Sequence, residues 1–127
     1  MSVKLARIIL YVQDVERLSE FYRQAFGFPL LQHIAGEWAV LKAGACELAL
    51  HRVGLPYRDA EGRPGEGSNA KIVFAIDTPI AETREKLIAV GVSIGEIKQY
   101  PGLTGLLCDG RDPEGNVFQL AQTGEKG

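Results

Sequence analysis

A repeat within the chain limits its fold more than any other feature of the sequence. A β-branched and aromatic run from Arg7 to Val12 predicts a strand, and a similar run begins at Lys71. Each run precedes a segment with apolar residues at helical spacing that ends in a glycine, Gly27 or Gly91. Both offsets equal 64 residues (71 − 7 and 91 − 27). Because the offset is held without a gap, we expect two copies of one structural unit.

Each expected helix has its own start signal and apolar side. Asp14 is a good N-cap residue for the first helix, and its apolar side comprises Val15, Leu18, Phe21, Tyr22, Ala25 and Phe26. For the second helix, Thr78 is the expected cap and Pro79 suits the first helical position. The expected buried residues of the second helix are Ile80, Leu87, Ile88 and Val90.

Three strand-like runs follow each helix. They cover about 28–34, 37–42 and 46–52 in the first copy and about 92–99, 103–109 and 116–122 in the second. A strong turn signal at 112–116 introduces the last run. We therefore predict an α+β fold in which two tandem βαβββ modules form a curved mixed sheet with a cleft, a common location for ligands.

We interpret the whole chain, 1–127, as a single domain made of module 1 (about 4–52), a linker (53–69) and module 2 (about 70–123). The linker is rich in glycine and proline, and it is longer than most connections in compact domains. It is either a passive flexible linker or a lid over a ligand pocket. In the second case Tyr57 and Arg58 are the expected contacts with the ligand.

The composition, 46% hydrophobic and 24% charged, is that of an ordinary globular protein. Fourteen basic residues against 16 acidic ones argue against a nucleic-acid-binding protein or a polybasic membrane protein. No apolar run approaches the roughly 20 residues that span a bilayer, and no signal-peptide pattern is present. Cys46 and Cys108 are too few for a disulfide framework, so we expect inert buried thiols and a cytoplasmic location.

Two motifs, FYRQAFGF at 21–28 and DPEGNVFQL at 112–120, resemble the vicinal oxygen chelate superfamily. This superfamily includes glyoxalases, extradiol dioxygenases, fosfomycin-modifying enzymes and bleomycin-resistance proteins. The resemblance covers about residues 4–122, and it implies the fold of the superfamily and a homodimer. It does not specify the reaction, because the same fold serves several chemistries and some members only bind ligands.

The resemblance also identifies four positions at which metal-dependent members hold their ion. The two first-strand positions, usually His or Gln, are Arg7 and Lys71 here, and the two last-strand positions are Glu47 (or Ala49) and Gln119. Arginine and protonated lysine have no lone pair to offer to a cation. We therefore expect no metal ion and no cofactor.

Two interpretations of the charged residues stay open. Arg7 and Lys71 either receive an anionic or carbonyl oxygen of a small molecule, or form a structural ion-pair cluster with Glu47 or extend into solvent.

Other side chains are weaker candidates. His51 shares a strand face with Glu47, and it is either a general base or metal ligand or simply a half-exposed polar residue. Tyr11 shares the face of Arg7. The candidates for an aromatic pocket wall, each of which could instead be core, are Tyr11, Trp38, Phe74 and Phe118. His33, near a turn, is the weakest candidate.

The predicted function is metal-independent binding of a small organic molecule in the sheet-lined cleft, similar to the sequestering bleomycin-resistance proteins. Those proteins present acidic grooves, which Arg7 and Lys71 do not match. The alternative is a metal-dependent lyase, isomerase or dioxygenase of the glyoxalase kind that uses Glu47, His51 and Gln119. A third class is a structural or regulatory partner protein whose cleft is filled by its own side chains. The sequence therefore leaves open whether the protein is an enzyme.

Overall fold

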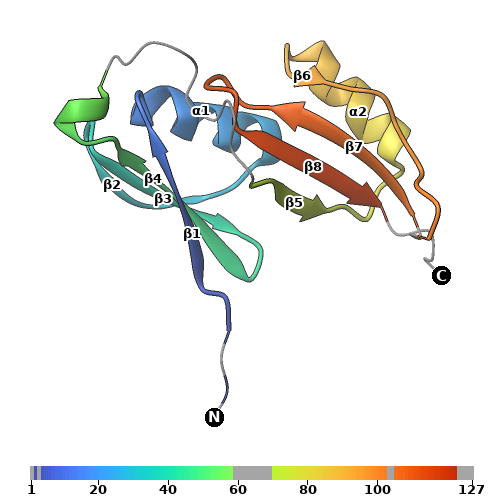
Figure 1. Ribbon diagram of the computed structural model, residues 1–127, viewed down its shortest axis with the longest axis horizontal. Coiled ribbons are helices and arrows are strands. Elements are labelled where there is room, and N and C mark those ends of the chain that lie inside the picture. The colour runs from blue at the N-terminus through green and yellow to red at the C-terminus, as the bar shows by residue number, and fades with distance from the viewer. Residues whose placement is uncertain (1, 3, 59–69, 103–104, 123–127) are drawn as a thin grey trace. The chain divides into compact units, whose positions relative to one another are not determined.

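The chain contains the order βαβββ twice, as the repeat predicts. The structure, a computed structural model, describes residues 2, 4–58, 70–102 and 105–122 (Figure 1). The chain divides into two compact units, Met1–Pro64 and Gly65–Gly127, and each unit contains one copy. Within the described residues, no helix is long and apolar enough to cross a membrane.

Module 1 is a four-stranded mixed sheet with one helix. Its elements are β1 (Arg7–Val12), α1 (Val15–Phe26), β2 (Leu30–Ile34), β3 (Trp38–Ala43), β4 (Cys46–Arg52) and a 3₁₀ turn at Leu55–Tyr57. The strand order is β1-β4-β3-β2, in which β1 is parallel to β4 and the other neighbours are antiparallel. Helix α1 packs on β3 and β4.

Helix α1 begins and ends where its capping residues predict. The Asp14 side chain accepts a hydrogen bond from the Arg17 backbone N–H at 3.0 Å. At the other end Gly27 has a φ of 72°, a left-handed conformation that favours glycine, and its N–H donates to the Arg23 carbonyl. Tyr22 is fully buried on the side that faces the sheet. The expected boundaries of this helix are confirmed. Of its expected apolar side, Val15, Leu18 and Tyr22 are buried and the other three residues are half-buried.

Module 2 repeats the arrangement with shorter elements. They are β5 (Ile72–Ala75), α2 (Ile80–Ala89), β6 (Ser93–Ile94), β7 (Leu106–Arg111) and β8 (Val117–Gln122). The strand order is β5-β8-β7-β6, and β5 is parallel to β8. Before β8, the carboxylate of Asp112 accepts hydrogen bonds from the Glu114 and Asn116 backbone N–H groups, which forms the expected turn.

The start of α2 differs from the prediction that Thr78 caps it. The N-cap residue is Pro79, which makes no side-chain capping bond. The Gln122 side-chain carbonyl from β8 instead accepts a hydrogen bond from the Ile80 N–H at 2.6 Å. A residue distant in the sequence therefore satisfies a helix-terminal donor that a local cap usually satisfies.

The expected apolar side of α2 is only half correct. Ile80 and Leu87 are buried, but Ile88 is 41% exposed and Val90 is 70% exposed. The helix ends at Ala89, so Val90 lies beyond its last turn. Ile88 directly follows Leu87, and consecutive helical residues point in directions about 100° apart.

The predicted strand over 92–99 is also wrong in its length. Only Ser93–Ile94 pairs with β7 as a strand, and Lys98 forms an isolated bridge with Leu107. Between them the Arg84 side chain donates to the Gly95 carbonyl at 2.7 Å, so this backbone group bonds to the helix side and not to a strand. Of the run predicted over 103–109, residues 103 and 104 lie outside the described residues, and β7 extends to Arg111.

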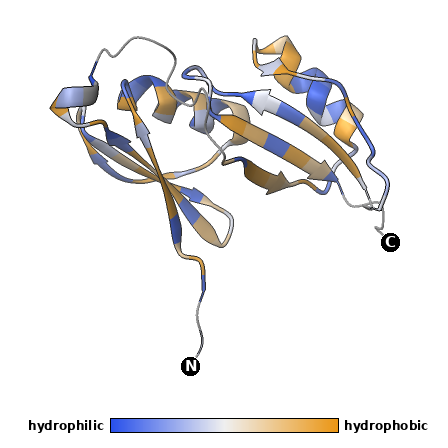
Figure 2. Cartoon of the chain, viewed as in Figure 1, coloured by the Kyte–Doolittle hydropathy of each residue, from blue (hydrophilic) through white to orange (hydrophobic). Residues whose placement is uncertain are grey.

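Strand alternation gives each sheet a face toward its own helix and an opposite face. Phe118 and Leu120 of β8 are fully buried on the helix side, and Gln119 between them is only half-buried on the other side. Figure 2 shows β8 as a mostly hydrophobic strand that hydrophilic residues interrupt. All seven candidate binding residues lie on the sheet faces opposite the helices, because along each strand they alternate with the residues that face the helix.

Candidate functional site

Five of the candidate residues lie together on the sheet face of module 1 that points away from α1. The parallel pairing of β1 and β4 sets Arg7 level with Glu47 and Tyr11 level with His51. The antiparallel pairing of β3 and β4 sets Trp38 opposite His51. We call these five residues the module 1 face.

An ion pair lies at one end of the module 1 face. Arg7 Nε and Nη2 donate hydrogen bonds to Glu47 Oε1 at 2.9 and 2.7 Å, and both side chains are about one-third exposed. The Arg7 guanidinium carbon lies 5.6 Å from the centroid of the Trp38 ring, within the distance of a cation–π contact. Arg7 is thus held between a carboxylate and an indole, and its remaining N–H donors are not used by Glu47.

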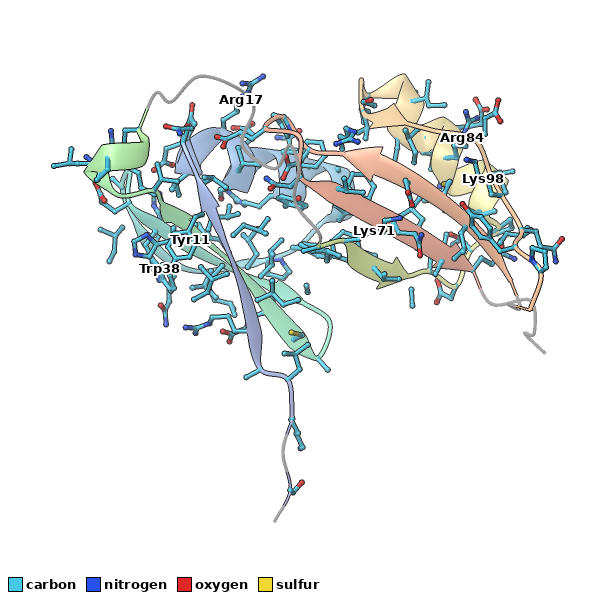
Figure 3. All side chains as sticks on the ribbon, viewed as in Figure 1. Tyr11, Arg17, Trp38, Lys71, Arg84 and Lys98 are labelled. Atoms are coloured by element: carbon cyan, nitrogen blue, oxygen red, sulfur yellow. The ribbon has the colours of Figure 1, made fainter. Side chains whose placement is uncertain are left out.

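Aromatic rings form the rest of the module 1 face. The Trp38 indole N–H donates to the Gln32 side-chain oxygen at 3.1 Å, and the His51 ring meets Trp38 edge-on at 5.6 Å. Tyr11 lies 5.1 Å from His51 and is 60% exposed, so it is available for contact with a ligand. Tyr11 and Trp38 lie on the same side of this sheet (Figure 3). His51 Nδ1 donates to the Arg52 carbonyl at 2.7 Å, which leaves Nε2 as the acceptor of the neutral ring.

The remaining two candidates, Lys71 and Gln119, meet in module 2 at a residue that the sequence analysis missed. Lys71 Nζ donates to Asp109 Oδ2 at 2.8 Å, and Gln119 Nε2 donates to Asp109 Oδ1 at 3.0 Å. Burial alone would raise the pKa of Asp109, but the hydrogen bonds from Lys71 and Gln119 outweigh it and hold the pKa below its ordinary value. The signal that could have found Asp109 is its place directly opposite Gln119 in the β7–β8 register.

Two of the expected wall residues lie on the other side of their sheet. The Phe74 and Phe118 rings are 6.1 Å apart, and Phe118 is fully buried. They form core, which was the alternative considered for them. Cys108 is also buried, and burial raises the pKa of its thiol, whereas Cys46 is only half-buried.

The linker contributes little to the described structure. The Arg58 side chain donates from Nε to the Val53 carbonyl at 2.9 Å, so it closes the turn at 55–57. The Tyr57 side chain and residues 59–69 lie outside the described residues. The lid therefore stays a prediction.

His33 has a structural partner in helix α1. Its Nε2 lies 2.9 Å from Glu16 Oε2, which also accepts a hydrogen bond from the Gly36 N–H at 2.7 Å. The Gly36 backbone bond, followed by the His33 bond, holds the pKa of Glu16 below its ordinary value of 4.5. This carboxylate ties the first turn of α1 to the β2–β3 turn.

Replacing Glu16 by glutamine is expected to lower the melting temperature at pH 7. A lowered native pKa stabilises the fold above the unfolded-state pKa, and this stabilisation disappears as the pH falls through the native pKa. The difference in melting temperature between wild type and Glu16→Gln should therefore shrink below about pH 4.5. Circular-dichroism melts over the acid range measure it, with Glu20→Gln on the same helix as the control. A difference that is constant or grows toward acid pH would contradict the role of Glu16.

The residues at the expected metal positions do not fit a divalent cation. Arg7 and Lys71 carry no lone pair, and the Glu47 carboxylate is already bonded to Arg7. Glu47 and His51 lie four residues apart on β4, so their Cα atoms are separated by about 13 Å, too far to share one ion. Throughout the described part of the chain, no three His, Cys, Asp or Glu residues gather in a group that could hold a metal.

Comparisons with known proteins agree on the fold and differ in function. The model of the Glyoxalase/Bleomycin resistance protein/Dioxygenase superfamily matches residues 4–120. TnmS3, an antibiotic-binding protein from Streptomyces sp. CB03234, is 24% identical, with 97% of this chain and 98% of that chain covered and a TM-score of 0.74. A lactoylglutathione lyase from Agrobacterium tumefaciens is 20% identical, with 95% and 94% covered and a TM-score of 0.73.

A third similar structure is a glyoxalase/bleomycin resistance protein from Streptomyces sp. CB03234, which is 25% identical with a TM-score of 0.69. The alignment covers 94% of this chain and 100% of that chain. A comparison with curated proteins finds no match. Since the family model spans nearly the whole sequence, the chain belongs to the glyoxalase/bleomycin resistance protein/dioxygenase superfamily.

Proposed function

We propose that the protein binds a small organic molecule without a metal ion, and that the module 1 face contacts this molecule. The observation that carries the proposal is the place of Arg7. At a position where metal-dependent relatives have a metal ligand, a guanidinium is held between Glu47 and Trp38. It presents N–H donors to a carbonyl or anionic oxygen, the same kind of atom that a metal ion would bind.

The aromatic residues of the face supply the apolar part of the proposed contact. Tyr11, Trp38 and His51 form a chain of ring contacts that begins beside Arg7. Ligand pockets are typically lined by apolar and aromatic groups with a few polar groups that fix the ligand's orientation. The module 1 face has this composition, with Arg7 and Glu47 as the polar groups. Lys71 and Gln119 of module 2 are proposed as further contacts.

The antibiotic-binding protein among the similar structures supports binding as the function. The lactoylglutathione lyase is the relative that favours the alternative, a metal-dependent lyase, isomerase or dioxygenase. That alternative requires Glu47, His51 and Gln119 to share an ion, and the separation of Glu47 and His51 along β4 disfavours it. A sheet-lined cleft as the binding place, a homodimer and a cytoplasmic location belong to the same proposal.

Trp38 makes the proposal directly testable, because it is the only tryptophan of the chain. A screen of small organic molecules in the presence of EDTA would follow the emission of Trp38, and Trp38→Phe would give the background. We expect at least one compound to change the emission saturably. If emission changes only after a divalent metal is added, or no compound changes it, the proposal is wrong.

A further inference from the structure

A pocket on module 2 is lined by several charged residues, most of which have no role in the proposed function. It has a volume of about 510 Å³ and lies on the sheet face that points away from α2. Its polar lining residues are Lys71, Ser93, Asp109 and Arg111. Only Lys71 was singled out from the sequence.

Strand register brings Lys71, Ser93 and Arg111 to one level of the sheet. Ser93 of β6 lies opposite Arg111 of β7, and Arg111 lies opposite Val117 of β8. Lys71 directly precedes Ile72, which pairs with Phe118 in parallel register, so Lys71 lies beside Val117. The two cations therefore flank Val117 from the two neighbouring strands, about 10 Å apart at the backbone. Both side chains are long enough to reach one group between them.

The charges of the pocket favour an anion. Lys71 is paired with Asp109, but Arg111 donates from Nη1 to the Gly115 carbonyl at 3.0 Å, a neutral partner. Among the described residues, no carboxylate lies within ion-pair distance of Arg111. Lys98 is close enough to Asp109 to act on it electrostatically, and Figure 3 shows Lys71 and Lys98 on this module. Lys71 and Lys98 thus both act on the Asp109 carboxylate, and Arg111 adds a further cation to the pocket.

The negative charge of Asp109 is already offset by its ion pair with Lys71. Each oxygen of Asp109 already accepts a hydrogen bond, one from Lys71 and one from Gln119. The Ser93 hydroxyl, in contrast, has no hydrogen-bond partner in the described part of the chain. The pocket therefore offers several unused donors to a ligand: the hydroxyl of Ser93, the remaining N–H groups of Arg111 and two N–H groups of Lys71.

We propose that this pocket binds the oxyanion group of a small organic molecule, a carboxylate or a phosphate, between Lys71 and Arg111 with the Ser93 hydroxyl as an additional donor. The inference rests on the proposed function in one respect, because Lys71 belongs to both. It adds the class of ligand, an organic anion, and two residues, Ser93 and Arg111, that had no assigned role.

The test is an NMR titration of the ¹⁵N-labelled full chain with sodium phosphate and, separately, with sodium succinate, at constant ionic strength and pH. We expect saturable shifts of the Gly95 and Gly110 amide signals with at least one of the two anions. Arg111→Gln should weaken binding about tenfold or more, because it removes a charged hydrogen-bond donor. Asp109→Asn should tighten binding several-fold, because it removes the negative charge from the pocket.

Arg17→Gln is the matched control, because Arg17 is an exposed arginine on α1 of module 1, and it should leave the affinity unchanged. A preference for phosphate or for succinate identifies the oxyanion, and either one supports the site. The inference is overturned if neither anion gives saturable shifts, or if Arg111→Gln and Arg17→Gln bind equally well. The Trp38 emission screen is independent of this result, so the two proposals can fail separately: loss of the anion site with an intact Trp38 response leaves the proposed function standing.

Discussion

Replacing Gly110 by alanine is expected to lower the free energy of unfolding by about 1–3 kcal/mol, the usual effect of overpacking a core. Gly110 lies opposite Phe118 in the β7–β8 register, and a Cβ at Gly110 would collide with the Phe118 ring. This ring is fully buried and its centroid lies 6.1 Å from that of Phe74, so a shift of the ring would disturb the packing around it. Chemical denaturation of wild type and Gly110→Ala measures the loss.

Two further variants separate the collision from a general effect of replacing glycine. Gly95→Ala is the control, because its Cβ would meet only the Asp109 carbonyl oxygen at 3.6 Å, an ordinary contact. Adding Phe118→Leu to Gly110→Ala should cost less than the sum of the two single changes, since the smaller side chain relieves the collision. Full additivity, or a Gly95→Ala loss as large as that of Gly110→Ala, would contradict this packing.

The second large effect concerns the ion pair on the module 1 face. Arg7→Gln is expected to weaken binding of a compound identified through Trp38 emission by about tenfold or more, because Arg7 supplies the charged donors. Glu47→Gln should leave the affinity for this compound unchanged or raise it, because it frees Arg7 from its carboxylate. Calorimetric titration of each variant measures the change.

Glu47→Gln also distinguishes metal-independent binding from the metal-dependent alternative. A metal-dependent mechanism would use Glu47 as a ligand, so the variant would lose binding. Arg52→Gln is the matched control, because Arg52 pairs with Glu37 at 3.4 Å and is 38% exposed, close to the 36% of Arg7. A loss with Glu47→Gln, or equal losses with Arg7→Gln and Arg52→Gln, would contradict the role assigned to Arg7.

The sequence predicted the fold best where local signals agree. In α1 an N-cap aspartate, an apolar side and a glycine in left-handed conformation all point to the same boundaries, and these were correct. In α2 the N-terminal hydrogen bond comes from Gln122, which is 42 residues away. The segment after α2 leaves its strand pairing where Arg84 bonds to Gly95. Such distant partners leave no local signal in the chain.

The same distinction applies to the candidate site. Strand alternation was sufficient to place Arg7 with Tyr11 and Glu47 with His51 on common faces, and register then brought the two pairs together. Asp109 was missed because its importance depends on which strand lies beside it. Only the β7–β8 register shows that it lies opposite Gln119, and the β5–β8 pairing brings Lys71 within reach of it.

The most direct test of the account is the affinity of the identified compound measured with and without metal. The protein would be dialysed against EDTA and titrated alone, and then with zinc, nickel, manganese, iron or cobalt added in turn. Because the donor set around Arg7 and Glu47 does not fit a divalent cation, we predict the same dissociation constant in every sample. Binding that is lost in EDTA and restored by one metal would contradict metal-independent binding and support the enzyme alternative.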